Sequence, residues 1–367
     1  MAGTLVKVPD MLREWPYPRR LNPHYEQVKA EGLAWINQFR LFDPESQDAF
    51  NRCDFAKLAM LAYQDHDLAR SRTGANFMTL LYLIDEYTDC ETAPSTLSMG
   101  EIVMDALRFP HKPRPAGEIP LGEVSRQFWA LGRETASPLA ERQFLHTMQR
   151  YLTAVVQQSD DRGKDYVRTF DEYLELRRDT TACLPSFAMM ALDMDFPDEV
   201  YECEELERLR EGAWRNIAVL NDIYSYHIER ARGHALHNSV TIIMHEKDLD
   251  PQGAVNWICE WSDGVLKEFI ETKNNLLSWG PEIDEQVARY VDGLAFWVRG
   301  NDDWTFESER YFGRNGAWVQ QNRELYMLPL VEAADARAAS HREEVDPETF
   351  GIAGMQIRRD LEVAARG

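Results

Sequence analysis

The chain has 367 residues, of which 44% are hydrophobic, and it carries a formal net charge of −22. This length and composition suffice for one large domain or two ordinary ones. The acidic balance argues against a general affinity for nucleic acid or an anionic membrane, because both are negatively charged. An anionic ligand would therefore need metal ions and well-placed arginines to offset the field of the protein.

The cysteines are few and scattered. They stand at positions 53, 90, 183, 203 and 259, an odd number without a Cys-x-x-Cys pair. This usage is typical of reduced thiols in an intracellular protein. The N-terminus has no basic region followed by an apolar core, so no signal peptide is predicted, and no apolar run reaches the ~18 residues of a membrane span. We expect a cytoplasmic protein.

Helical periodicity dominates the chain after an irregular, proline-punctuated start over residues 1–23. Ser98 and Glu101 form a capping box that predicts the start of a short helix, and residues 109–120 form the clearest loop. Alternating strand patterns are nearly absent, and the best strand candidate, residues 240–244, is short and isolated. The predicted long helices cover residues 24–40, 54–67, 73–89, 121–135, 138–161, 166–191, 198–232, 251–278 and 282–299.

These elements predict an all-α fold, a single-domain helical barrel or bundle with a central apolar pocket. The helical domain is expected over residues 24–332. The charged, alanine-rich tail over 333–367 is expected to form a surface helix or to be partly disordered.

One stretch, residues 221–229, places Asn221, Ser225 and Glu229 at intervals of four. On a helix this spacing puts the three side chains on one face. An amide oxygen, a hydroxyl and a carboxylate in a row suit a hard cation such as Mg²⁺. Three such residues alone are more often a polar stripe on a solvated helix, so the interpretation needs a second signal.

A second oxygen-rich face ends the apolar run 77–84. Asp85 and Asp89 are again four residues apart and share a helix face. Two such faces at the ends of apolar helices could share metal ions across a cavity.

Arginines accompany both faces. Arg177 and Arg178 precede Asn221 by about 43 residues, the pair Arg310-Tyr311 follows it by 89, and Arg230 and Arg232 come directly after Glu229. Guanidinium forks and a tyrosine hydroxyl suit the oxygens of a diphosphate. Any one arginine is more often a surface charge, but the spacing of the full set argues against that explanation.

With these motifs the chain resembles a class I terpene synthase, and it is most similar to the fungal sesquiterpene cyclases. Residues 85–89 match the family's Asp-(Asp/Glu)-x-x-Asp motif, which alone is weak, and residues 221–229 match its specific Asn-Asp-x-x-Ser-x-x-x-Glu motif. The family also has an upstream diphosphate-sensing arginine and a C-terminal Arg-Tyr pair. The resemblance covers about residues 9–325.

The resemblance implies three Mg²⁺ ions, with Mn²⁺ as a possible substitute. Asp89 would be a weaker metal ligand, or it would contact a ligand rather than the metal itself. Many relatives have a lysine where this chain has Ile228, and Arg232 could supply the missing contact. The implied metal ligands are Asp85, Asn221, Ser225 and Glu229, and the implied diphosphate-binding residues are Arg178, with Arg177 as the alternative, Arg310 and Tyr311.

A carbocation formed in such a site must be shielded from water and guided by aromatic faces. Trp304 lies six residues before Arg310, where relatives place a pocket tryptophan. Phe187 and Phe55 are further pocket candidates, although ordinary core packing explains them equally well.

The resemblance thus implies an Mg²⁺-dependent lyase that ionises an allylic prenyl diphosphate, with farnesyl diphosphate expected, and releases diphosphate and a sesquiterpene. Residues 221–226, 232–233 and 237–241, together with the motif 85–89, resemble the branch that makes humulyl-derived hydrocarbons such as protoilludene. Capture of the cation by water, giving nerolidol or linalool, is the alternative product class. The enzyme is expected to be a monomer or homodimer.

Three rival functions remain open at this point. A prenyl-chain-elongating transferase would carry two Asp-rich repeats, and this chain has one. A di-iron bundle would need Glu-x-x-His pairs, which the sequence lacks. A catalytically dead helical protein that binds lipid would be expected to lose metal ligands, and all four are present.

Overall fold

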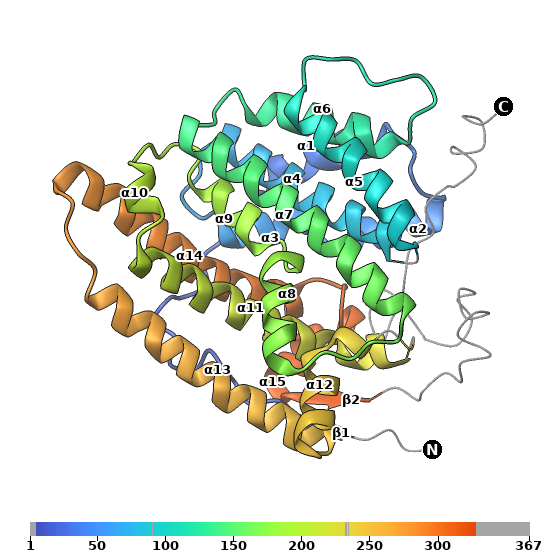
Figure 1. The fold of residues 1–367 in the computed structure, drawn as a ribbon, viewed down its shortest axis with the longest axis vertical. Helices are drawn as coiled ribbons and strands as arrows, with labels where there is room; N and C mark the ends of the chain where they lie inside the picture. The colour runs from blue at the N-terminus through green and yellow to red at the C-terminus, as the bar shows by residue number, and fades with distance from the viewer. Residues whose placement is uncertain (1–4, 90, 232, 234, 328–367) are drawn as a thin grey trace.

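The computed structural model describes residues 5–89, 91–231, 233 and 235–327, which form the helical bundle of Figure 1. Helices make up nearly all of their regular structure, which confirms the predicted all-α fold. The helices are α1 (Tyr25–Asn37), α2 (Pro44–Arg52), α3 (Phe55–Ala62), α4 (Leu68–Thr88), α5 (Ala93–Arg108), α6 (Pro120–Gly132), α7 (Pro138–Gly163), α8 (Phe170–Thr180), α9 (Cys183–Met190), α10 (Asp198–Tyr201), α11 (Glu204–Ala231), α12 (Ser239–Lys247), α13 (Pro251–Asn274), α14 (Pro281–Glu307) and α15 (Gly316–Asn322), with short 3-10 turns at Ala235–His237 and Gly313–Asn315.

The long helix α11 is the element against which much of the C-terminal half packs. Glutamates in its first turn favour the helix start, because negative charge stabilises the N-terminal end of the helix dipole. Between residues 213 and 228 every side chain except Arg215 and Asn221 is buried. Accordingly α11 contacts α8, α9, α12, α13 and α14, and it lies between α13 and α14 in Figure 1. A helix buried on most sides can present a polar stripe to an internal cavity.

An aromatic cluster holds the N-terminal half together. Phe77 of α4 meets Phe144 of α7 edge-on, with ring centroids 5.2 Å apart, and Trp129 of α6 lies 4.3 Å from Phe144. These rings are fully buried, and such pairs contribute about 0.5–1.5 kcal/mol beyond the area they bury. The cluster fixes α4 in the bundle, so the acidic end of that helix has a defined position.

Several predicted helix boundaries are wrong. Residues 166–191 form two helices, α8 and α9, because Ala182 between them adopts a left-handed conformation with φ 55°, which a continuous α-helix does not accommodate. The capping box at Ser98 does not start a helix: α5 already begins at Ala93, behind Thr92 and with a proline in its first turn. Residues 240–244 lie within α12 rather than in a strand.

Helix α2 and a small sheet are among the elements that the sequence patterns missed. Helix α2 begins behind Asp43, whose carboxylate accepts a hydrogen bond from the Ser46 backbone amide at 2.9 Å. A small antiparallel sheet pairs β1 (Leu5–Lys7) with β2 (Glu324–Tyr326), with Val6 opposite Leu325. This sheet ties the first described residues to the last ones. The predicted tail over 333–367 lies outside the described residues.

In the part of the chain that the structure describes, no helix combines the length and the apolar character needed to span a bilayer. The four cysteines described there, at positions 53, 183, 203 and 259, are free thiols.

Candidate active site

A cavity of about 300 Å³ lies where α4, α7, α8, α9, α11 and α14 meet. One end of its wall is apolar, with Leu58, Met78, Leu81, Ile217 and Trp297. The other end carries the carboxylates, the amide and the arginines that the sequence motifs singled out. A second hollow, at the loop after α5, is lined by arginines already paired with glutamates, such as Arg114 with Glu118, and it contains none of the predicted site residues.

The first polar face comes from the C-terminal end of α4. Asp85 and Asp89 both line the cavity. The Asp85 side chain is 46% exposed, but this surface faces the cavity. Removal from bulk water, together with the nearby negative charge of Asp89, raises the pKa of the Asp85 carboxyl to about 8. The two carboxylates therefore form a repulsive pair that positive charge would stabilise.

The second polar face is the stripe on α11. Asn221, Ser225 and Glu229 all line the cavity, as their spacing of four predicts. Glu229 accepts a hydrogen bond from the Asn238 side-chain amide at 3.0 Å. Burial, and then the charge of Asp222, raise the pKa of the Glu229 carboxyl.

The structure brings Arg177 into this site, and Arg178 is not among the residues that line the cavity. Successive residues on an α-helix point roughly 100° apart, so only one of the two neighbours can face α11. The Arg177 guanidinium donates to Asn221 Oδ1 at 3.1 Å and to Asp222 Oδ1 at 2.9 Å. The sequence analysis preferred Arg178 and kept Arg177 as the alternative; both lie in the last turn of α8, and Arg177 is the one that lines the cavity.

Asp222 is a functional residue to which the sequence analysis gave no role. Asp222 is 2% exposed, and its side chain joins α11 to two other helices: to α8 through Arg177 and the Tyr173 hydroxyl at 2.6 Å, and to α12 through the Ser239 backbone amide at 2.7 Å. It follows Asn221 in the motif, so it points around the helix from the ligand stripe, toward α8 and α12. We interpret it as the residue that positions Arg177.

The pair Arg310-Tyr311 connects the two polar faces. Arg310 donates to Glu86 Oε1 at 3.1 Å and lies 3.5 Å from Asp85 Oδ2, with its guanidinium 5.4 Å from the centroid of the Tyr82 ring. The Tyr311 hydroxyl accepts a hydrogen bond from the Asn221 amide at 2.7 Å. Glu86, the variable position of the acidic motif, is thus a contact of Arg310 that the sequence analysis did not identify.

The three predicted pocket aromatics lie one layer behind the cavity wall. Trp304 packs against Tyr82 and Tyr311 at 5.6 and 5.7 Å, Phe55 stacks on Tyr82 at 4.1 Å, and Phe187 packs against Trp297 at 6.3 Å. Their positions in the sequence could not show that other aromatic rings would separate them from the cavity. The aromatic side chains on the wall are Tyr82, Tyr151, Trp297 and Tyr311.

Asn301 is a polar wall residue for which the sequence gave no signal. It lies one helical turn after Trp297 on α14, lines the cavity and is 5% exposed. Its side-chain Nδ2 has no hydrogen-bond partner among the described residues. An unpaired buried donor costs about 1–3 kcal/mol, so a contact with a molecule in the cavity is the natural explanation for this amide.

The donor set fits hard divalent cations. Within the described residues no three His, Cys, Asp or Glu side chains converge as a preformed centre. Instead, carboxylates on α4 face an amide, a hydroxyl and a carboxylate on α11, and all of these are oxygen donors, as Mg²⁺ prefers. The raised pKa values of Asp85 and Glu229 indicate sites where a cation would relieve repulsion. Arg232, the alternative diphosphate contact, lies outside the described residues.

Comparisons with known proteins agree with this site. Residues 76–268 match the model of terpene synthase family 2, C-terminal metal binding. A delta(6)-protoilludene synthase from Stereum hirsutum is 46% identical over 326 residues, covering 89% of this chain and 88% of the relative. The corresponding enzyme from Armillaria gallica is also 46% identical, covering 88% of this chain and 94% of the relative. The solved linalool/nerolidol synthase from Streptomyces clavuligerus, 22% identical, shares the fold with a TM-score of 0.69 over 79% of this chain and 99% of its own.

The fold and the site therefore define a metal-binding helical lyase of the class I type. The chain belongs to the terpene synthase family, and the curated relatives reported above are fungal sesquiterpene cyclases. The transferase, di-iron and lipid-binding alternatives are not favoured.

We expect Arg177→Ala to lower kcat/KM by about 100-fold or more, the loss typical for removal of a donor that stabilises developing negative charge. The matched control is Arg178→Ala, which should change kcat/KM by no more than about threefold, because Arg178 does not line the cavity. Steady-state kinetics with farnesyl diphosphate measure both. A larger loss for Arg178→Ala than for Arg177→Ala would contradict this assignment.

Proposed function

We propose that this terpene synthase uses Mg²⁺ to ionise farnesyl diphosphate and closes the resulting cation to a sesquiterpene hydrocarbon, with release of diphosphate. The observation that carries the proposal is the division of one cavity into two ends. Two oxygen-rich faces, Arg177, Arg310 and Tyr311 meet at one end, and apolar side chains form the other. A prenyl diphosphate has the same division between its charged head and its hydrocarbon chain.

The proposed metal ligands are Asp85, with Asp89 beside it, on α4 and the stripe Asn221, Ser225 and Glu229 on α11. When bound there, Mg²⁺ supplies positive charge that stabilises the diphosphate leaving group. Three ions are proposed from the resemblance to the family. The net charge of the protein, −22, makes such local positive charge necessary for an anionic substrate.

The residues of the chain complete the anion site. Arg177 and Arg310 can donate charge-assisted hydrogen bonds to the diphosphate, and the Tyr311 hydroxyl can donate a further one. Their present partners, Asp222, Glu86 and Asn221, hold these donors in place before substrate arrives. Donors oriented in advance stabilise developing charge without reorganising at the moment of reaction.

The apolar end protects the carbocation. Aliphatic side chains such as Leu58 and Ile217 exclude water, which would otherwise capture the cation. The rings of Tyr82 and Trp297 on the same wall can face the positive charge, with an attraction of about 0.5–2 kcal/mol per ring.

For the product we propose a humulyl-derived cyclic hydrocarbon such as protoilludene, because relatives at 46% identity are named protoilludene synthases. One observation keeps an acyclic alcohol as the second candidate: the unpaired amide of Asn301 on the cavity wall could hold a water molecule. The free thiols of the described cysteines are consistent with the cytoplasmic location that we propose.

Activity on farnesyl diphosphate should require Mg²⁺ and disappear with EDTA, because every proposed ligand is an oxygen donor. Glu229→Gln, which keeps the shape of the side chain but removes its charge, should lower kcat by about 100-fold or more. The control is Glu211→Gln on the same helix, whose carboxylate pairs with Arg215 away from the cavity wall. Gas chromatography of the volatile products measures the effect of EDTA and the activity of both variants. Full turnover in EDTA would refute the metal role.

Replacement of Asn301 by leucine, of similar size, should stabilise the protein by about 1 kcal/mol, because it removes an unpaired buried amide. The fraction of oxygenated product should fall in the same variant if this amide holds water. Thermal unfolding and separate incubations with farnesyl and geranyl diphosphate measure the two effects. An unchanged product ratio would show that Asn301 has no part in water capture.

A further inference from the structure

The pair Arg310-Tyr311 lies beyond the end of α14, so the helix alone does not fix its position. Glu307 ends the helix, and the residues that follow turn away from its axis. They are held by the turn between α2 and α3, residues 52–54. The Glu309 backbone amide donates to the Arg52 carbonyl at 3.3 Å, and the Arg52 guanidinium lies 3.2 Å from the Glu309 carboxylate.

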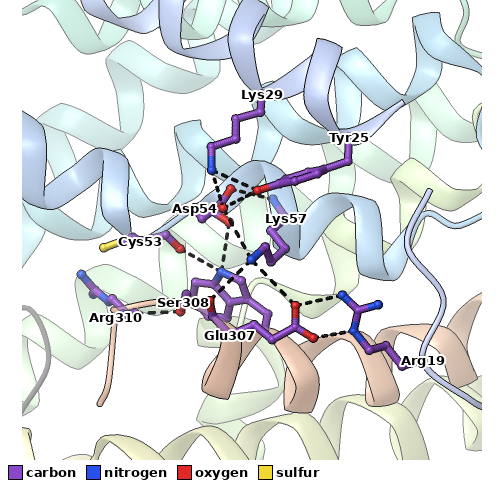
Figure 2. Close-up of polar contacts among 10 residues, drawn as sticks. Arg19, Tyr25, Lys29, Cys53, Asp54, Lys57, Glu307, Ser308 and Arg310 are labelled. Carbon is purple, nitrogen blue, oxygen red and sulfur yellow. Dashed lines mark hydrogen bonds and ion pairs between the residues drawn. The ribbon is translucent and has the colours of Figure 1, made fainter. Parts of the chain in front are cut away.

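The last turn of α14 is attached to the same turn. The Trp304 indole Nε1 donates to the Cys53 carbonyl at 2.9 Å and to the Asp54 carbonyl at 3.0 Å. In Figure 2, Lys57 also extends from α3 toward Glu307, and its Nζ is 3.5 Å from the Glu307 carbonyl. The α2–α3 turn therefore carries the helix end and the segment that leads to Arg310.

Asp54 gives this turn its shape. It has a left-handed backbone, with φ 51° and ψ 56°, a conformation that is unfavourable for an L-residue. Its carboxylate compensates by accepting from the Lys57 backbone amide at 3.2 Å, which caps α3. The opposite oxygen accepts from the Tyr25 hydroxyl and from Lys29 Nζ, both at 2.6 Å.

Figure 2 shows this arrangement from the side: Tyr25 and Lys29 reach Asp54 from α1, and Glu307, Ser308 and Arg310 lie on the opposite side of the turn. The Asp54 side chain is 9% exposed, and a buried acceptor that lost these hydrogen bonds would be left unsatisfied. The carboxylate thus locks the two carbonyls that receive the Trp304 indole.

We propose that Asp54 is a positioning residue for Arg310: anchored by Tyr25 and Lys29, it holds the turn on which the segment that carries Arg310 is seated. Asp54 acts through Trp304 and the 307–309 backbone and does not touch the substrate. The inference rests on the proposed diphosphate-binding role of Arg310. The position of Arg310 matters for activity, because a misplacement of about 1 Å of a group in a site can cost about 100-fold in rate.

The test is a double-mutant cycle with Asp54→Asn and Arg310→Ala, assayed with farnesyl diphosphate and Mg²⁺. We expect Asp54→Asn to lower kcat/KM by about tenfold in the wild-type background and by less than about twofold when Arg310 is already alanine. Inhibition by inorganic diphosphate with Mg²⁺ should weaken in Asp54→Asn in parallel. Tyr25→Phe, which removes only one hydrogen bond to the carboxylate, should give a smaller loss with the same dependence on Arg310.

The chain offers a matched control in Asp292. This carboxylate also lies at a Tyr-Lys pair, with the Tyr17 hydroxyl at 2.9 Å and Lys273 Nζ at 2.5 Å, but it is on α14 about four helical turns before Glu307. Asp292→Asn should leave kcat/KM and diphosphate inhibition unchanged, whatever its effect on melting temperature.

The outcomes separate the inference from the proposed function. If Asp54→Asn lowers activity by the same factor in both Arg310 backgrounds, its effect is general stability and the positioning role is wrong. If Asp54→Asn does not fold, Tyr25→Phe decides by the same comparison. If Arg310→Ala alone has wild-type activity and wild-type inhibition by diphosphate, the proposed role of Arg310 fails first.

Discussion

The carboxylates that face the cavity repel one another, and the surrounding chain is arranged to contain that repulsion. Asp85 has Arg310 near it on the α4 side, and Glu229 has the Asn238 amide on the α11 side. Burial, and then the charge of a neighbouring carboxylate, Asp89 or Asp222, raise the pKa values of Asp85 and Glu229. A stable core would avoid such unfavourable charge, and its presence beside a cavity is typical of functional sites.

Asp222 explains how the helices around α11 acquire their arrangement. Through one carboxylate it binds side chains of α8 and the first backbone amide of α12. Helix α8 then ends near the cavity, and the left-handed Ala182 lets α9 start in a new direction. Residues 180–183 therefore line the cavity, where one continuous helix would have carried some of them away from it.

The C-terminal contribution to the site depends on contacts with residues far apart in the sequence. Arg310 and Tyr311 each bind one of the two polar faces, while their own segment rests on the turn at 52–54. The rings of Trp304 and Phe55 fill the space between that turn and Tyr82 on the cavity wall. A rigid layer behind the wall preserves the shape of the pocket, which matters because pocket shape directs the folding of a flexible cation.

The sequence by itself determined the helical class and the two ligand faces, because intervals of four place side chains on one face of a helix wherever it packs. It also identified Arg310 and Tyr311 as site candidates, through their resemblance to a family pattern. It could not choose between Arg177 and Arg178, foresee Asp222, Glu86 or Asn301, or place Trp304 behind the wall. Those features depend on the rotation of each helix about its axis and on neighbours dozens to hundreds of residues away. Packing of the whole chain sets both, and no local spacing encodes them.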